Sequence, residues 1–223
     1  MRIVPLLPST CAPQPWGSFP AAELAWTGTL HPDWARPGAG GPPVHALHLP
    51  WEPWGPALGD HALAALRTGL DADFLVLRAA DPGDRAQVSA FMAVLEGLLE
   101  MTQGQGIKLA LRPGPGAAPG LAARLREVRG EAVGFCWDAA AGADLACFSD
   151  RLFCAVGEPG DDFRPIQALG YRWNLAIPAQ DPANLRQVMA DILRAFPPVL
   201  FPAGLAQRAA GTPQDPHDPK EHP

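Results

Sequence analysis

Apolar and polar positions follow two alternating patterns along this chain. Short, nearly continuous apolar runs are typical of buried parallel strands, and they occur at residues 2–7, 21–28, 44–50, 73–79, 107–113, 131–138, 151–158 and 171–178. Several of the stretches between them carry apolar residues at every third or fourth position, as amphipathic helices do. Strands that alternate with helices in this way predict parallel βαβ units.

The unit from Ile107 to Asp138 shows the pattern most clearly. Its first apolar run is followed by a Gly/Pro-rich loop, a short amphipathic segment, and a second apolar run that begins at Glu131. Arg112 and Asp138 stand at the carboxyl ends of the two predicted strands. Ligands bind at that end in parallel α/β folds, so both residues are candidate site residues.

The predicted helices differ in strength. The strongest spans Asp84 to Gln103, with Asp84 as its cap and Gly104 after its end, and another begins behind Asp181 and ends before Pro197. We also expect a helix capped by Asp60 and weaker helices at 139–148 and 161–170. Residues 29–43 are too rich in proline and glycine to form a helix.

Eight strands with helices between most of them predict a (β/α)8 TIM barrel. We expect a single barrel domain over residues 1–208, with reduced or missing helices after the first two strands. Residues 209–223 are polar and rich in proline, and we expect them to be a disordered tail. An open doubly wound sheet is the alternative, but no Gly-rich dinucleotide loop follows the first strand.

Composition narrows the range of partners. The chain has 223 residues, 48% of them hydrophobic, and a formal net charge of −6, so no overall field attracts nucleic acid. The apolar runs are too short to cross a membrane, and the first residues do not form a signal peptide, which predicts a cytoplasmic protein. The four cysteines lack CxxC spacing, and no GxSxG, phosphate-binding loop or zinc motif occurs, so we expect no cofactor. The oligomeric state stays open.

Five segments together resemble the xylose isomerase-like TIM barrels, a superfamily that includes sugar isomerases, epimerases and apurinic endonucleases. The segments are AAELAWTG, FLVLRA, GIKLALRPGPG, VGFCWDAAAGAD and GYRWNLAIP. The resemblance covers roughly residues 1–196. It implies a barrel that acts on sugars or related compounds and holds a divalent metal through carboxylates and histidines at the strand ends.

Most of those metal-ligand positions are changed in this sequence. At the positions where the resemblance would place histidines and carboxylates, this sequence has Arg78, Arg112, Ala141, Pro178 and the Cys154–Ala155 pair. Asp138 remains, and so does Glu23 on the second strand. One or two carboxylates do not make a hard-cation site, so we expect no bound metal.

The charged replacements have two interpretations. Arg112 and Asp138 could form an ion pair that fills the former metal site, with Arg78 joining Glu23, because buried charges need partners. Alternatively, Arg78 and Arg112 could hold a phosphate or carboxylate through forked hydrogen bonds.

Further candidates lie near the predicted strand ends. His48 is a candidate general base, with Glu52 nearby, although a histidine at a strand end can equally be structural. Asp138 and Glu158 are two strand-end carboxylates, but their spacing gives no support to glycoside hydrolysis. The rings of Trp16, Trp51 and Trp54 could stack on a ligand, or they could fill the space of the missing helices.

Two functions follow from these observations. The first is a barrel that binds a small anionic or carbohydrate ligand, or a protein partner, without the metal-dependent chemistry that the resemblance implies. The second is an isomerase or epimerase of sugars or sugar phosphates that works without metal. Whether the protein is an enzyme is therefore open, and no nucleic-acid or membrane partner is expected.

Overall fold

The apolar runs form eight parallel strands that close into one barrel, as predicted. The computed structural model describes residues 1–36, 38–50, 55–79, 85–114, 116–126, 128, 131–141, 145 and 151–196. The strands are β1 (Arg2–Pro8), β2 (Ala22–Ala25), β3 (Val44–His48), β4 (Ala72–Ala79), β5 (Lys108–Pro113), β6 (Val133–Asp138), β7 (Leu152–Val156) and β8 (Asn174–Pro178). Each strand pairs with the next, and β8 pairs with β1.

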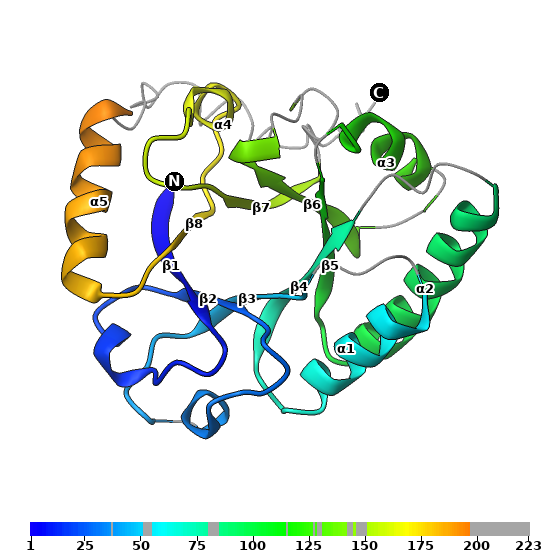
Figure 1. Ribbon diagram of the computed structural model, residues 1–223, viewed down its shortest axis with the longest axis horizontal. Helices are drawn as coiled ribbons and strands as arrows, with labels where there is room; N and C mark the ends of the chain where they lie inside the picture. Colours follow the sequence, from blue (N-terminus) through cyan, green and yellow to red (C-terminus); the bar gives the residue numbers. More distant parts are fainter. Residues whose placement is uncertain are drawn as a thin grey trace, which may run out of the picture.

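Helices surround only part of this ring. They are α1 (Pro56–Leu66), α2 (Arg85–Gln103), α3 (Ala118–Leu125), α4 (Arg164–Ala168) and α5 (Pro182–Ala195). After β1 and β2 the described chain has only the 3-10 turns η1 (Gln14–Trp16) and η2 (Pro32–Ala35), which confirms the reduced helices after the first two strands. Figure 1 shows α1, α2 and α3 on one side of the ring and α5 on the other, with short turns beside β1, β2 and β3.

Some predicted helix ends differ from the structure. Asp181 does cap α5, since its side chain accepts a hydrogen bond from the Asn184 backbone N–H. Asp60 instead lies inside α1, because that helix begins one turn earlier at Pro56, a residue whose ring is well suited to the first position. The predicted helix at 139–148 is represented by the 3-10 turn η3 (Ala139–Ala141). Asp84 and the predicted tail 209–223 lie outside the described residues.

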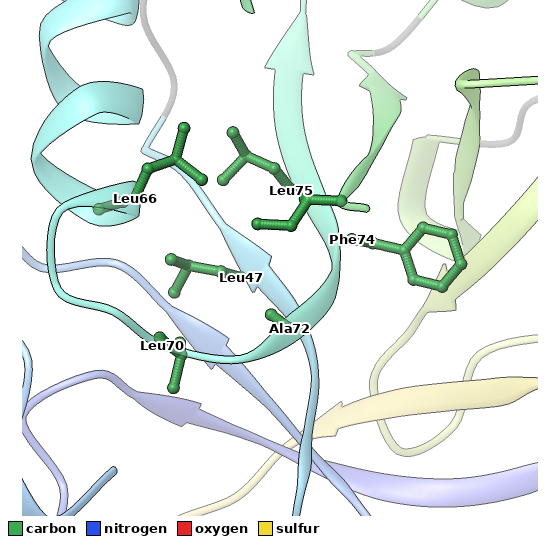
Figure 2. Close-up of a pocket in the computed structure, with 8 residues that line it drawn as sticks. Leu47, Leu66, Leu70, Ala72, Phe74 and Leu75 are labelled. Atoms are coloured by element: carbon green, nitrogen blue, oxygen red, sulfur yellow. The ribbon is translucent and has the colours of Figure 1, made fainter. Parts of the chain in front are cut away.

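Alternate side chains of each strand face the helices and the barrel interior. Leu47 of β3 and Leu75 of β4 point toward Leu66 of α1, whereas Phe74 points the opposite way (Figure 2). The gap between these leucines has a volume of only about 10 Å³, too small for a ligand. The core therefore has an outer layer between strands and helices and a second cluster inside the ring.

Two bulges bring extra side chains into the ring. In β3, Ala22 pairs with Val44 and Glu23 with Ala46, so His45 is an additional residue. In β7 the pairing skips Phe153 in the same way. The rings of both residues pack against Phe74, His45 with a centroid separation of 5.0 Å and Phe153 at 5.3 Å. These aromatic contacts lie toward the amino-terminal ends of β3, β4 and β7, whereas barrels of this kind bind ligands at the carboxyl ends of their strands.

No helix in the described part of the chain is both long enough and apolar enough to cross a membrane.

Candidate functional site

Two arginines and an aspartate meet at the carboxyl ends of β4, β5 and β6. Arg78 and Arg112 are register partners on adjacent strands. Arg112 Nε donates a hydrogen bond of 2.8 Å to Asp138 Oδ2, and the Ala140 backbone N–H donates one of 3.1 Å to Asp138 Oδ1. The ion pair predicted between Arg112 and Asp138 is therefore present, with both side chains held in fixed positions.

A hollow of about 360 Å³ opens beside this ion pair. We call it the arginine hollow, and its lining residues are Arg78, Arg112, Pro113, Gly114, Asp138, Ala140 and Ala141. The side chains of Arg112 and Asp138 are only 16% and 12% exposed, whereas Arg78 is exposed. Within the described residues Arg78 has no carboxylate partner, which leaves its guanidinium free to face a ligand.

Glu23 forms a second polar cluster with His45 and His48, inside the barrel. Glu23 is completely buried, and its two carboxylate oxygens lie 3.1 Å from His45 Nδ1 and 2.7 Å from His48 Nε2. The suggested pairing of Arg78 with Glu23 is thus wrong, because histidines from the adjacent strand already occupy both oxygens. Burial raises the pKa of Glu23, but the hydrogen bonds from the two histidines outweigh it and the pKa lies below its usual value.

The contact with Glu23 fixes the role of one nitrogen of His48. An ionised carboxylate accepts hydrogen bonds only, so His48 Nε2 donates to it. His48 Nδ1 is buried and has no hydrogen-bond partner among the residues that the structure describes. A carboxylate that orients a histidine and leaves its second nitrogen bare is an arrangement suited to a general base. Glu52, its suggested neighbour, lies outside the described residues.

His45 is the member of this cluster that sequence reasoning missed. In a regular strand, His45 and His48 would face opposite sides, since they lie three positions apart. The bulge in β3 turns His45 inward as well, so both histidines reach Glu23. No residue pattern around VHALH marks the bulge. The inward position of His45 therefore becomes visible only in the register of the sheet.

The other candidate residues lie elsewhere. Glu158 is exposed beyond β7 and does not line the arginine hollow. Trp16 is 2% exposed and packs on Phe19, which favours the interpretation that it fills space beside the missing helices. Trp51 and Trp54 lie outside the described residues, so their stacking stays a prediction.

The donor set does not fit a divalent metal. Both oxygens of Glu23 and both oxygens of Asp138 already accept hydrogen bonds, and the positive charge of Arg112 lies 2.8 Å from Asp138. Cys154 points into the barrel beside its register partner Cys136, and burial raises the pKa of its thiol well above the usual value. In the part of the chain that the structure describes, no three His, Cys, Asp or Glu side chains are grouped to hold a metal ion.

A larger hollow, of about 610 Å³, lies outside the barrel. It is lined mainly by residues 33–36 and 38–43 with Asp71 and Asp73, beside the amino-terminal ends of β3 and β4. One of its three carboxylates, Asp33, is already bonded by Gln14 and Arg36. We therefore place the candidate site in the arginine hollow, at the end of the barrel where such folds bind ligands.

Solved structures with the same architecture match almost the whole described chain. An AP endonuclease of family 2 from Brucella melitensis matches with a TM-score of 0.66 at 14% identity, covering 87% of this chain and 99% of the other. A xylose isomerase domain protein from Planctomyces limnophilus matches with a TM-score of 0.63 at 12% identity, covering 86% of this chain and 96% of the other. A 3-keto-D-glucoside 4-epimerase from E. coli matches with a TM-score of 0.58 at 14% identity, covering 87% of this chain and 99% of the other.

These matches confirm the fold that the sequence resemblance predicted. At such low identities they show the fold alone. No family model matches the sequence, and no curated protein matches it either.

Proposed function

We propose that this xylose isomerase-like barrel binds a small anionic or carbohydrate ligand in the arginine hollow at the carboxyl ends of its strands. The single observation that carries the proposal is the register pairing of Arg78 with Arg112 beside Asp138. Two guanidinium groups on adjacent strands repel each other unless anions separate them, and Asp138 neutralises only one. A ligand anion is the natural partner of the other. We place this binding in the cytoplasm, in line with the sequence.

The hollow also has the right size and polarity. Its volume of about 360 Å³ lies within the range of small-molecule sites, which span roughly 300–1,000 Å³. Guanidinium groups bind carboxylates and phosphates through paired hydrogen bonds. Asp138 adds an acceptor for a hydrogen bond from a hydroxyl group, as a carbohydrate would require.

A panel of aldoses, ketoses, their phosphates and simple carboxylates tests the proposal by calorimetry. We expect binding of at least one anionic compound, and a loss of about tenfold or more in affinity in Arg78→Gln, because a charge-assisted hydrogen bond is removed. Arg194→Gln, which removes an exposed arginine from the far end of α5, is the matched control. Unchanged affinity in Arg78→Gln would contradict the proposed site.

A second function is favoured by the Glu23–His48 contact. A metal-independent isomerase or epimerase needs a base that removes a proton from carbon, and His48, whose Nδ1 has no hydrogen-bond partner among the described residues, is the candidate for this role. In this function Glu23 holds the His48 ring, and Arg112 with Arg78 stabilises the negative charge that develops on the substrate.

Deuterium incorporation separates the two functions. Incubation in D₂O with the same panel, without added metal, would place deuterium on the substrate carbon if His48 acts as a base, and His48→Gln would abolish the incorporation. Binding without any incorporation would leave the protein a binding barrel.

A further inference from the structure

We propose that the ligand of the arginine hollow is a small hydroxycarboxylate, a monoanion that carries at least one hydroxyl group. This inference rests on the proposed function and names its ligand class. It follows from the charges, the free hydrogen-bond donors and the fixed acceptor that the described residues present to the hollow.

The first step is the charge of the hollow. Arg78 and Arg112 are positively charged at every physiological pH, and Asp138 is the one carboxylate among the described lining residues. Asp138 lies within 2.8 Å of Arg112, so among the described residues the positive charge of Arg78 has no carboxylate partner. A ligand with a single negative charge balances the site. A neutral sugar would leave Arg78 unpaired. A phosphate monoester carries nearly two negative charges, more than Arg78 can neutralise, and its excess charge would lie close to the Asp138 carboxylate.

The second step is the number of free donors. A guanidinium has five N–H donors, and Arg112 uses its Nε–H on Asp138. Because this contact holds the guanidinium plane, the terminal nitrogens of Arg112 keep a fixed direction. Arg78 is exposed and pairs in register with Arg112, so both groups can donate to one carboxylate.

The third step is the hydroxyl group. Asp138 is held at both oxygens, by Arg112 Nε and the Ala140 N–H, and each carboxylate oxygen can still accept a further hydrogen bond. Since the Asp138 side chain is only 12% exposed, a ligand that covers the hollow would displace its remaining water. A hydroxyl donor on the ligand replaces that water, and an apolar group there would leave the carboxylate poorly solvated.

Four matched probes test this inference by isothermal titration calorimetry. They are glycerate, propionate without its hydroxyl groups, glycerol without its charge, and glycerol 3-phosphate with a phosphate in place of the carboxylate. We expect glycerate to bind best, propionate and glycerol 3-phosphate to bind about tenfold more weakly, and glycerol not to bind at millimolar concentration.

Two variants sharpen the test. Asp138→Asn keeps the size of the side chain but removes its charge, so it should shift the preference about tenfold or more from glycerate toward glycerol 3-phosphate. Arg78→Gln changes an exposed side chain, leaves the fold intact, and should weaken glycerate and glycerol 3-phosphate together. Arg194→Gln should bind all four probes as the unchanged protein does.

The outcomes distinguish the inference from the proposed function. Tighter binding of glycerol 3-phosphate than of glycerate would overturn the monoanion while leaving an anion site in place. Equal binding of propionate and glycerate would overturn the hydroxyl group. No binding of any anion, or binding that Arg78→Gln does not change, would overturn both the inference and the proposed function.

Discussion

Glu23 is the residue whose surroundings differ most from those of an ordinary carboxylate. It is completely buried inside the barrel, and among the described residues its two oxygens are contacted by two histidines and no arginine. A buried carboxylate is stable only when its partners satisfy both oxygens. The cluster of Glu23, His45 and His48 therefore depends on all three residues.

Replacement of Glu23 by glutamine should destabilise the protein by about 3–5 kcal/mol, the usual cost of removing one partner from a buried charged pair. The pH dependence should change as well. The folded pKa of Glu23 lies below its ordinary value of 4.5, so its stabilisation is complete above that pH and is lost as the pH falls toward the folded pKa.

Urea denaturation at a series of pH values measures this effect. The unchanged protein should lose stability below about pH 4.5 more steeply than Glu23→Gln, which lacks the titrating group. Parallel curves for the two proteins would show that Glu23 contributes nothing to the acid dependence.

The pair of Arg112 and Asp138 allows a charge-reversal experiment. Arg112→Glu should destabilise the fold by about 3 kcal/mol, because two poorly exposed carboxylates would then face each other. Arg112→Met, which removes the cation without adding a negative charge, should cost less and serves as the control. Adding Asp138→Arg to Arg112→Glu should restore part of the loss, and a double swap that is no more stable than Arg112→Glu would contradict the pairing.

At the scale of single residues, the sequence predicted the contact between Arg112 and Asp138 but missed the contact between Glu23 and His45. Arg112 and Asp138 follow adjacent predicted strands, and carboxyl ends of neighbouring parallel strands lie side by side, so their contact could be inferred. The contact of Glu23 with His45 could not, because it depends on one extra residue in β3. A sequence read with a strict two-residue period places His45 on the outer face.

Between the elements β6 and β7, Gly134 has no room for a side chain. A Cβ atom on Gly134 would lie within 2.6 Å of the Phe153 ring and would also meet the Arg151 carbonyl oxygen. Phe153 is the extra residue of the β7 bulge, so the absence of a side chain at Gly134 makes room for the bulged ring inside the barrel.

Gly134→Ala should therefore destabilise the protein by about 1–3 kcal/mol through overpacking. Gly97→Ala in α2 is the matched control, since a Cβ atom there would have no neighbour within 4 Å and alanine favours a helix by about 0.5–1 kcal/mol. Thermal unfolding of both variants gives the comparison. A Gly134→Ala variant as stable as the parent protein would mean that β7 can shift away without cost.

The helices show why their ends are harder to predict than their presence. Apolar spacing predicted α2 and α5, but α1 begins at a proline behind Gly55, with no side chain that bonds the free N–H groups. Asp60 is a residue type that often caps helices, but it lies one turn inside this helix. A capping residue is therefore informative only where the apolar pattern also begins, as it does behind Asp181.

For the molecule as a whole, the alternation of strands and helices sufficed to predict the barrel. The turns η1 and η2 take the place of helices after β1 and β2, as the proline and glycine content of those connections indicated. The sequence could not show which part of the chain contacts the connection between β1 and β2. In the structure Arg186 of α5 bonds Ser18 and lies over the ring of Phe19.

Elemental analysis of the purified protein after dialysis tests the fit of the site to metal. We expect less than one equivalent of tightly held divalent metal, and melting curves that Mn²⁺ or Zn²⁺ do not shift, because the oxygens of Glu23 and Asp138 already have partners. One equivalent of retained metal, or a large rise in melting temperature on its addition, would overturn the placement of Arg112 beside Asp138.

The pairing of β1 with β8 has a consequence for how the protein is made. Arg2 lies opposite Asn174, so the first strand keeps an open edge until most of the chain has left the ribosome. Open edges of apolar strands pair readily with other chains, and contacts between distant segments form slowly. A nascent chain that stalls before Asn174 would therefore present both edges of an unclosed sheet, and this is the stage at which we expect the protein to depend most on chaperones.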